Sequence, residues 1–194
     1  IHTAITLCER GYNLVIIDSL VNSSNEAIKR LIKFLSRKKD FNENQIIFYK
    51  GDIRDTTFLR KVFNDNNSSN NKIDLVIHFA GLKSLSESFI KKEEYWDVNV
   101  NGTKQLLKVM EENKCFNMVF SSSASIYLQD KNFALNEESE VYANNPYSQT
   151  KLEVENILQN LQKSNFINWK IISLRYFNPI GSHPSGLFGE FPLN

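Results

Sequence analysis

Cysteine is scarce in this sequence. Only Cys8 and Cys115 occur in 194 residues, and they do not form a C-x-x-C pair. Two such residues cannot supply the disulfide framework of a small secreted domain, and their spacing is not that of a zinc site. The scarcity of cysteine therefore favours a reducing compartment, and we expect the protein to be cytoplasmic.

Charge of one sign and long apolar runs are also missing. Lysine and arginine number 23 against 22 aspartates and glutamates, which gives a formal net charge of +1. No overall field therefore attracts nucleic acid or an anionic membrane. No apolar run approaches the roughly 20 residues of a membrane span. We expect neither nucleic acid nor membrane as a partner, so a phosphate-bearing ligand would have to be held by local groups.

Histidines at metal-ligand spacing are absent as well. His2 and His183 have no cysteine or histidine partner nearby in the sequence. His78 lies between Ile77 and Phe79 in an apolar run, where a hydrogen-bonded core histidine is the expected state. The sequence therefore predicts no metal site.

A glycine-rich turn is missing from the first residues. The chain opens with "IHTAITLCER", which predicts a helix over residues 1–10, followed by Gly11 and an apolar strand that ends on Asp18. In a dinucleotide fold, an acidic residue at the end of the second strand binds the adenosine ribose and favours NAD over NADP, and the glycine fingerprint lies about 20 residues earlier. We therefore expect a strand and a glycine-rich turn to precede Ile1. Taken alone, Asp18 also fits a residue that merely begins a turn.

Apolar strands alternate with amphipathic helices along the rest of the chain. The predicted strands are 14–18, 46–52, 74–81, 117–123 and 170–177, and the predicted helices are 1–10, 25–35, 56–63, 94–113 and 147–163. The polar segment "NDNNSSNN" (64–71) is expected to be a surface loop. This alternation predicts an α/β fold with a doubly wound, Rossmann-type parallel sheet covered on both faces.

Polar or glycine-bearing residues follow each predicted strand. In doubly wound sheets, ligands bind in the crevice at the carboxyl ends of the strands. The residues at these ends are Asp18, Gly51–Ile53, Phe79–Gly81, Ser121–Ser123 and Asn178–Pro179. A crevice for a long nucleotide requires an edge of this kind.

The motif "YSQTK" carries the strongest chemical signal. Tyr147 and Lys151 are four residues apart near the start of a predicted helix, so their side chains share one face. A free tyrosine has a pKa of about 10, and a neighbouring ammonium stabilises the phenolate, so we expect a lowered pKa for Tyr147. Such a pair suits proton transfer at a sugar hydroxyl. The spacing also occurs by chance in helices, but Ser123 at the preceding strand end supplies a third polar group.

These residues carry a family resemblance. The segment "GDIRD" and the Tyr-Lys pair after a serine-rich strand end resemble the extended short-chain dehydrogenase/reductase family. Within it, "VIHFAGLKSLSES", "NVNGT", "FSSSASIY", "NPYSQTKLEVE" and "RYFNPIGSHPSGLFGE" resemble the UDP-glucose 4-epimerases over nearly the whole chain. The resemblance implies an NAD-binding domain over residues 1–179 that lacks its first strand and glycine loop. It also implies the start of a substrate-binding domain over residues 180–194.

The resemblance further implies roles for individual residues. Tyr147 would act as base and acid at the sugar O4, Ser123 would bond the same hydroxyl, and Lys151 would hold the nicotinamide ribose. The residues implied to bind NAD are Asp18, Asn22, Ser23, Asp52, Ile53, Phe79, Ala80, Gly81, Lys83, Tyr147 and Lys151. Those implied to bind the substrate are Lys83, Ser123, Tyr147 and Asn178.

The implied reaction interconverts UDP-galactose and UDP-glucose at C4 through a transient 4-keto sugar, with NAD taking and returning the hydride. The complete protein would be a homodimer, with residues 95–113 and 147–162 as candidate faces. Two alternatives stay open. A nucleotide-sugar dehydratase needs an acidic pair just after the active-strand serine, where this chain has Ala124 and Ser125. A catalytically silent fragment is the other alternative, because the pyrophosphate turn and most of the substrate domain are expected outside residues 1–194.

Overall fold

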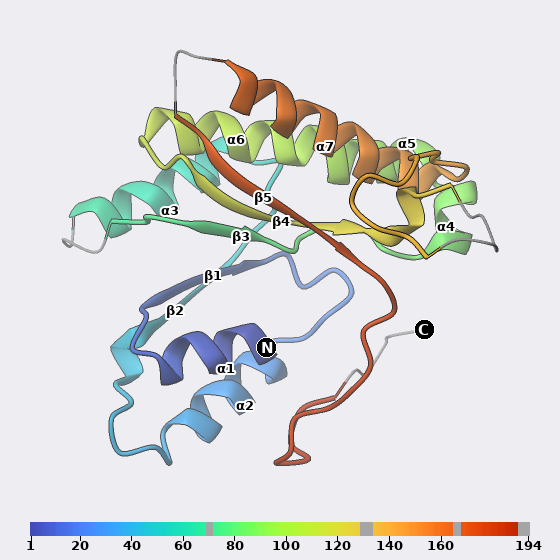
Figure 1. The fold of residues 1–194 in the computed structure, drawn as a ribbon. Coiled ribbons are helices and arrows are strands. Elements are labelled where there is room, and N and C mark those ends of the chain that lie inside the picture. The colour runs from blue at the N-terminus through green and yellow to red at the C-terminus, as the bar shows by residue number, and fades with distance from the viewer. Residues whose placement is uncertain (69–71, 129–133, 165–167, 190–194) are drawn as a thin grey trace. The chain divides into compact units, whose positions relative to one another are not determined.

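The computed structural model describes residues 1–68, 72–128, 134–164 and 168–189. The chain forms two compact units. One contains Ile1–Asp52 and the segment from Ile180 onward, and the other contains Ile53–Pro179. Helices and parallel strands build both units (Figure 1). The division into an NAD-binding and a substrate-binding domain stays a prediction.

The first unit is built on two parallel strands. Its elements are α1 (His2–Glu9), β1 (Leu14–Asp18), α2 (Glu26–Leu35), the 3-10 turn η1 (Glu43–Gln45) and β2 (Ile46–Lys50). In the register of β1 and β2, Leu14 lies opposite Ile46 and Asp18 opposite Lys50. Gly11 follows α1 with a φ of +82°, a conformation that glycine adopts without steric cost and that reverses the chain into β1.

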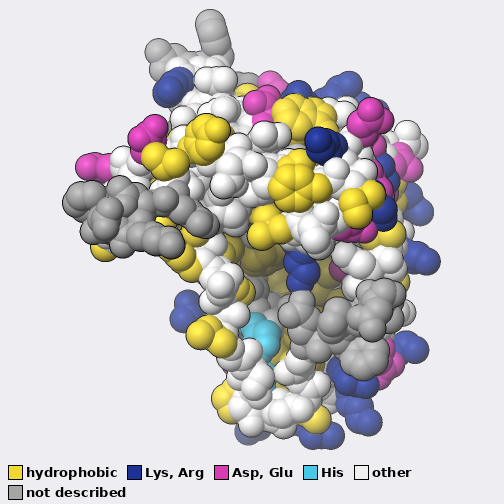
Figure 2. Space-filling model, turned by 90° about the vertical axis from the view of Figure 1, so that its right-hand side faces the viewer, with side chains coloured by type: hydrophobic (Ala, Val, Ile, Leu, Met, Phe, Trp, Pro, Cys, Tyr) yellow, Lys and Arg dark blue, Asp and Glu magenta, His cyan; other side chains and the backbone are white. Residues whose placement is uncertain are grey.

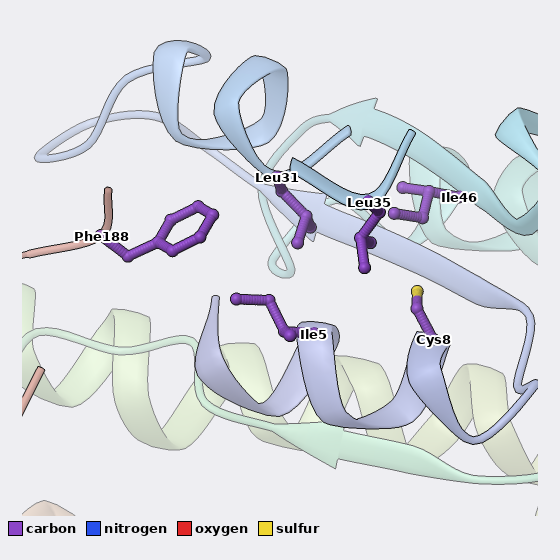
Figure 3. Close-up of a cluster of buried hydrophobic side chains, with 6 residues drawn as sticks. All are labelled: Ile5, Cys8, Leu31, Leu35, Ile46 and Phe188. Carbon is purple, nitrogen blue, oxygen red and sulfur yellow. The ribbon is translucent and has the colours of Figure 1, made fainter. Parts of the chain in front are cut away.

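A small apolar core holds this unit together (Figure 3). Leu31 and Leu35 of α2 are four residues apart on one helix face, and both are buried. The ring of Phe188 packs edge-on against Phe34 at 5.4 Å between centroids. The buried cluster consists of Ile5, Cys8, Leu31, Leu35, Ile46 and Phe188. The segment from Ile180 onward therefore contributes to the core of the N-terminal unit.

The second unit contains a three-stranded parallel sheet with β4 in the centre. Its elements are α3 (Thr56–Ser68), β3 (Val76–His78), α4 (Leu85–Ile90), α5 (Lys92–Trp96), the π-helical turn η2 (Asp97–Asn101), α6 (Gly102–Glu112), β4 (Asn117–Ser123), the 3-10 turn η3 (Ala124–Ile126), α7 (Pro146–Lys163) and β5 (Lys170–Tyr176). The last residue of β4, Ser123, lies opposite Tyr176 of β5. Figure 1 shows α6 and α7 along one face of this sheet.

The parallel α/β architecture is confirmed, with four differences in detail. The described strands hydrogen-bond as two sheets, β1-β2 and β3-β4-β5. The helix α4 was not predicted, and the helix predicted over 94–113 contains the π-helical turn η2. The predicted loop over 64–71 is wrong in its first part, because α3 continues to Ser68; residues 69–71 lie outside the described residues. Asn66 is buried on this helix and donates its amide to the Val62 carbonyl, 2.8 Å away.

Both cysteines are buried free thiols. No helix in the described part of the chain combines the length and the apolar character that a membrane span needs. Within the same residues, no three histidine, cysteine, aspartate or glutamate side chains gather as metal ligands.

Candidate active site

The start of α7 is fixed by its own sequence. Asn145 caps the helix: its side-chain oxygen accepts a hydrogen bond from the Ser148 amide at 2.8 Å, and its own amide donates to Ser148 Oγ at 3.3 Å. Pro146 occupies the first helical position, where its fixed φ suits a helix and its missing N–H costs nothing. The following residues Tyr147 and Lys151 therefore lie on one face of the first two turns.

Lys151 is a buried cation, with 6% of its surface exposed. Its Nζ donates to the Ser121 carbonyl at 2.8 Å and lies 5.0 Å from the centre of the Phe120 ring. It also lies 5.8 Å from the centre of the Tyr147 ring. Burial lowers the pKa of Lys151 to about 8. The ammonium is therefore the main form at neutral pH, but it deprotonates far more readily than an exposed lysine.

Tyr147 is half-buried, and burial raises its pKa above the ordinary value. A hydrogen bond with Ser123 and the charge of Lys83 both lower this pKa, but burial outweighs them. The expectation of a net lowered pKa is therefore wrong for the chain itself. Lys83, from the segment after β3, is the cation that lowers it, whereas the expected cation was Lys151.

Ser123 ends β4 and caps the turn η3. Its Oγ donates to Ser125 Oγ at 2.9 Å and accepts from the Ser125 amide at 3.2 Å. Because it also bonds Tyr147, the hydroxyl lies between the strand end and the first turn of α7. The structure thus brings Ser123, Tyr147 and Lys151 together, as the sequence analysis expected.

Asn99 ties the segment after β3 to α7. Its Oδ1 accepts from the Leu82 amide at 2.7 Å, and its Nδ2 donates to the Leu82 carbonyl and to Thr150 Oγ1, both at 3.0 Å. Gly81 has a φ of +153°, and a Cβ there would lie 2.9 Å from Asn99 Oδ1, so only glycine allows this approach. Sequence reasoning missed Asn99, because an asparagine on a helix gives no sign of what it contacts.

His78 is a core residue, with 3% of its surface exposed. Its Nε2 lies 2.8 Å from Thr103 Oγ1. Burial, followed by the charge of Lys151, lowers the pKa of His78 to about 3. The predicted hydrogen-bonded core histidine is confirmed, and the imidazole is neutral at physiological pH.

The first unit carries four of the residues predicted to bind a cofactor: Asp18, Asn22, Ser23 and Asp52. Asp18 is the last residue of β1, and its Oδ1 accepts from the Leu20 amide at 2.8 Å and from Ser23 Oγ at 3.0 Å. Asp18 therefore does organise a turn, and these same bonds orient its carboxylate. Asn22 is exposed on this turn.

The second unit carries the remaining predicted site residues: Ile53, Phe79, Ala80, Gly81, Lys83, Ser123, Tyr147, Lys151 and Asn178. Ile53 is buried against the start of α6, where a Cβ on Gly102 would lie 2.9 Å from its Cδ1. Phe79 and Ala80 are exposed beyond β3, and Asn178 is exposed beyond β5. The binding roles of all these residues stay predictions.

The model of the NAD dependent epimerase/dehydratase family matches residues 2–191. The chain belongs to this family. A family relative, UDP-glucose 4-epimerase 2 of Arabidopsis thaliana, is 45% identical over 192 residues, which are 99% of the chain and 52% of the relative. The UDP-glucose 4-epimerase of Yersinia enterocolitica is 43% identical over 98% of the chain and 53% of its own length.

Solved structures of epimerases resemble the chain in the same way. The UDP-glucose 4-epimerase of Bifidobacterium longum, crystallised with NAD⁺ and UDP, superimposes with a TM-score of 0.87 at 40% identity. The match covers 98% of this chain and 53% of that protein. The chain therefore spans about half the length of the epimerases that it matches.

Proposed function

We propose that the chain is the catalytic part of an NAD-dependent UDP-glucose 4-epimerase that interconverts UDP-galactose and UDP-glucose. The observation that carries this proposal is the convergence of Ser123, Tyr147 and Lys151 at the carboxyl end of β4. Three such groups suit the removal and return of a proton at a sugar hydroxyl. The epimerase names of relatives at 43% to 45% identity support the substrate class.

Each of the three side chains has a defined task. Tyr147 takes the proton of the sugar O4 and returns it to the 4-keto sugar after that intermediate has presented its other face. Ser123, which is hydrogen-bonded to Tyr147, turns its single hydroxyl proton from Ser125 Oγ to the same sugar oxygen and keeps that oxygen in line with the phenol. The positive charge of Lys83 favours the phenolate, and Lys151 holds the nicotinamide ribose. Asn178 and Lys83 bind the UDP-sugar from the segments after β5 and β3.

The residues present fit NAD. Within the described part of the chain, both hydrogen bonds to Asp18 go to Oδ1, which leaves Oδ2 for ribose hydroxyls. The ammonium of Lys151 has three protons, and Ser121 is its hydrogen-bond acceptor among the described residues, so ribose hydroxyls can accept the others. When bound, NAD supplies hydride transfer. The further residues proposed to bind NAD are Asn22, Ser23 and Asp52 of the first unit and Ile53, Phe79, Ala80, Gly81 and Lys83 of the second.

Dehydration is disfavoured by the residues that follow Ser123. Elimination of water needs a further acid and base beside the sugar, and the chain places Ala124 and Ser125 there, at the start of η3. Neither side chain carries a carboxylate. Beyond the hydride transfer that NAD supplies, epimerisation needs only the proton transfer that Tyr147 performs.

We also propose that the protein is a cytoplasmic homodimer. The helices α6 and α7 border a groove of roughly 220 Å³ lined by Lys104, Leu107, Lys108, Glu111, Ile157, Leu161 and Trp169. Apolar side chains are also exposed on α4 and α5, namely Leu85, Phe89, Ile90 and Trp96. Figure 2, which faces the side of the second unit with α4 and α5, shows hydrophobic side chains gathered among charged ones. Light scattering that finds only monomers would contradict the dimer.

Tyr147→Phe tests the proposed function. With UDP-galactose and NAD, we expect the purified protein to form UDP-glucose, measured with a coupled UDP-glucose dehydrogenase assay. The variant should lose about 10²- to 10⁴-fold in kcat, because it lacks the proton-transferring oxygen. Its NAD affinity should stay within about threefold, because Lys151 and the other cofactor residues are intact.

Tyr12→Phe, at an exposed tyrosine of the first unit, is the matched control and should keep full activity. A Tyr147→Phe protein that loses NAD as well as turnover would make Tyr147 a structural residue. A native protein that binds NAD but leaves UDP-galactose unchanged would contradict the proposed function.

A further inference from the structure

A buried ion pair lies next to the active residues on α7. The side chain of Glu155 is 2% exposed and that of Arg175 is 19% exposed. Arg175 Nη2 donates to Glu155 Oε2 at 2.7 Å, and its Nε lies 3.1 Å and 3.2 Å from the two carboxylate oxygens. Hydrogen bonds with Glu155 raise the pKa of Arg175 further, so this cation stays charged at every pH at which the protein folds.

The pair also holds groups on two other segments. Ser122 Oγ donates to Glu155 Oε1 at 2.5 Å. The Arg175 guanidinium lies 4.9 Å from the centre of the Tyr127 ring, and its Nη1 donates to the Glu137 carbonyl at 3.3 Å. One salt bridge therefore joins α7, the ends of β4 and β5, and the segment around Glu137.

Two of these groups, Glu155 and Ser122, are next to residues of the proposed active site. Glu155 follows Lys151 by one helical turn, and Ser122 immediately precedes Ser123. In the sheet register Ser122 lies opposite Arg175. The pair therefore fixes the strand end that carries Ser123 against the helix that carries Tyr147.

The segment around Glu137, which Arg175 contacts, also pairs with the residues that follow β4. Residues 134–142 run back beside η3, where the Leu128 amide donates to the Glu140 carbonyl at 2.9 Å. The Tyr142 amide donates to the Ile126 carbonyl at 2.7 Å, and Tyr127 forms an antiparallel bridge with Val141. Arg175 contacts both of these paired segments: the ring of Tyr127 on one and the carbonyl of Glu137 on the other.

Stability alone does not account for such a pair. Removing two charges from water is costly, and apolar residues of similar volume often replace buried ion pairs with no loss of stability. A bidentate guanidinium and carboxylate, in contrast, fix distance and orientation in a way that apolar packing does not. We propose that Glu155 and Arg175 are positioning residues that set the place of Ser123 against Tyr147 and hold residues 134–142 beside the active strand.

The catalytic part of this inference rests on the proposed function, so the test has a structural and a kinetic readout. The double variant Glu155→Leu/Arg175→Met replaces the pair with apolar side chains, and Arg175→Lys keeps the charge but not the planar fork. The matched control is Arg60→Met/Glu112→Gln. That pair is also bidentate, with both N···O distances 2.8 Å, but it is exposed between α3 and α6.

We expect both variants to fold with melting temperatures close to that of the native protein. Amide hydrogen exchange should become faster in residues 121–128 and 134–142, because their common anchor is gone. With UDP-galactose, kcat should fall about 10- to 100-fold while KM changes little, because a small misplacement of a catalytic group costs that much in rate. The control should match the native protein in both readouts.

Two results would overturn the inference. One is a variant in which the amide exchange rates of residues 121–128 and 134–142 and the kcat all equal those of the native protein. The other is full recovery of both readouts by Arg175→Lys relative to the double variant, since charge compensation alone would then explain the pair. If the double variant does not fold, Arg175→Lys decides by the same readouts. If the native protein shows no turnover but exchange becomes faster as expected, the proposed function fails and the positioning role stands.

Discussion

In the second unit, the buried Lys151 lies close enough to the buried His78 to influence the charge of the imidazole. The charge of Lys151 contributes to the lowered pKa of His78, after burial itself. Lys151 keeps a carbonyl acceptor and two aromatic rings around its ammonium, whereas the hydrogen-bonding partner of His78 is the Thr103 hydroxyl. The unit thus accommodates one positive charge at this place and holds the imidazole neutral.

His78→Gln tests whether the folded protein holds the imidazole neutral. The unfolded imidazole has a pKa of about 6.5, so between pH 6.5 and about 3 the unfolded state binds a proton that the folded state does not. Stability therefore falls as the pH falls through this window, by up to about 1.4 kcal/mol per pH unit. Glutamine keeps a polar group for Thr103 but does not titrate, so urea unfolding from pH 7 to 4 should show a shallower loss. Curves of equal slope would contradict the assignment, and His2→Gln at an exposed site is the control.

At the scale of elements, the π-helical turn η2 between α5 and α6 positions the site. A π-helical turn adds a residue to the helical register and is frequent at functional sites. Here it presents the buried side chain of Asn99 to Leu82 and Thr150. Three hydrogen bonds from one amide therefore connect the segment after β3 with α7.

Because of these hydrogen bonds, Asn99→Ala should lower the free energy of unfolding. The change leaves the Leu82 amide and carbonyl without their side-chain partner in a part-buried place, and we expect a loss of about 2 to 4 kcal/mol in the free energy of unfolding. Asn101→Ala, on the same turn, removes one hydrogen bond to Asp97 and should cost less than about 1 kcal/mol. Chemical denaturation measures both. Equal losses in the two variants would show that Asn99 has no special role.

At the scale of the whole molecule, the chain leaves its first unit at Asp52 and re-enters it at Ile180. Phe188 is buried there among residues of α1, α2 and β2, and Phe34 and His183 pack edge-on against its ring at 5.4 Å and 5.5 Å. A segment far along the sequence thus completes the smaller core. The stability of the first unit should depend on this late segment.

Phe188→Ala should loosen the first unit selectively. Removing a buried phenyl ring costs about 3 kcal/mol or more, and the described core residues that cluster with Phe188 belong to this unit. Hydrogen exchange in α1, β1, α2 and β2 should become faster, while exchange in β4 and α7 stays native. Leu187→Ala, at an exposed neighbouring site, should change neither region. Faster exchange throughout the molecule would contradict the division into two units.

Local features of the sequence predicted much of the fold and of the candidate site. The alternation of apolar strands with helices predicted the parallel α/β fold, because strand and helix periodicities differ and each is visible within a few residues. The spacing of Tyr147 and Lys151 predicted a shared helix face, and Ser123 was expected beside them because strand ends meet at one edge. The resemblance carried by "NPYSQTKLEVE" and its companion motifs led to the family that the chain belongs to.

Contacts between distant residues were decided only by the tertiary structure. The pKa of Tyr147 depends on its burial and on Lys83, 64 positions away by number, and neither can be read from the motif around it. The hydrogen bonds of Asn99 and the pairing of Glu155 with Arg175 arise from the packing of helices on the sheet and from strand register. Sequence periodicity determines which elements form, whereas burial and long-range geometry determine what each side chain contacts and what charge it carries.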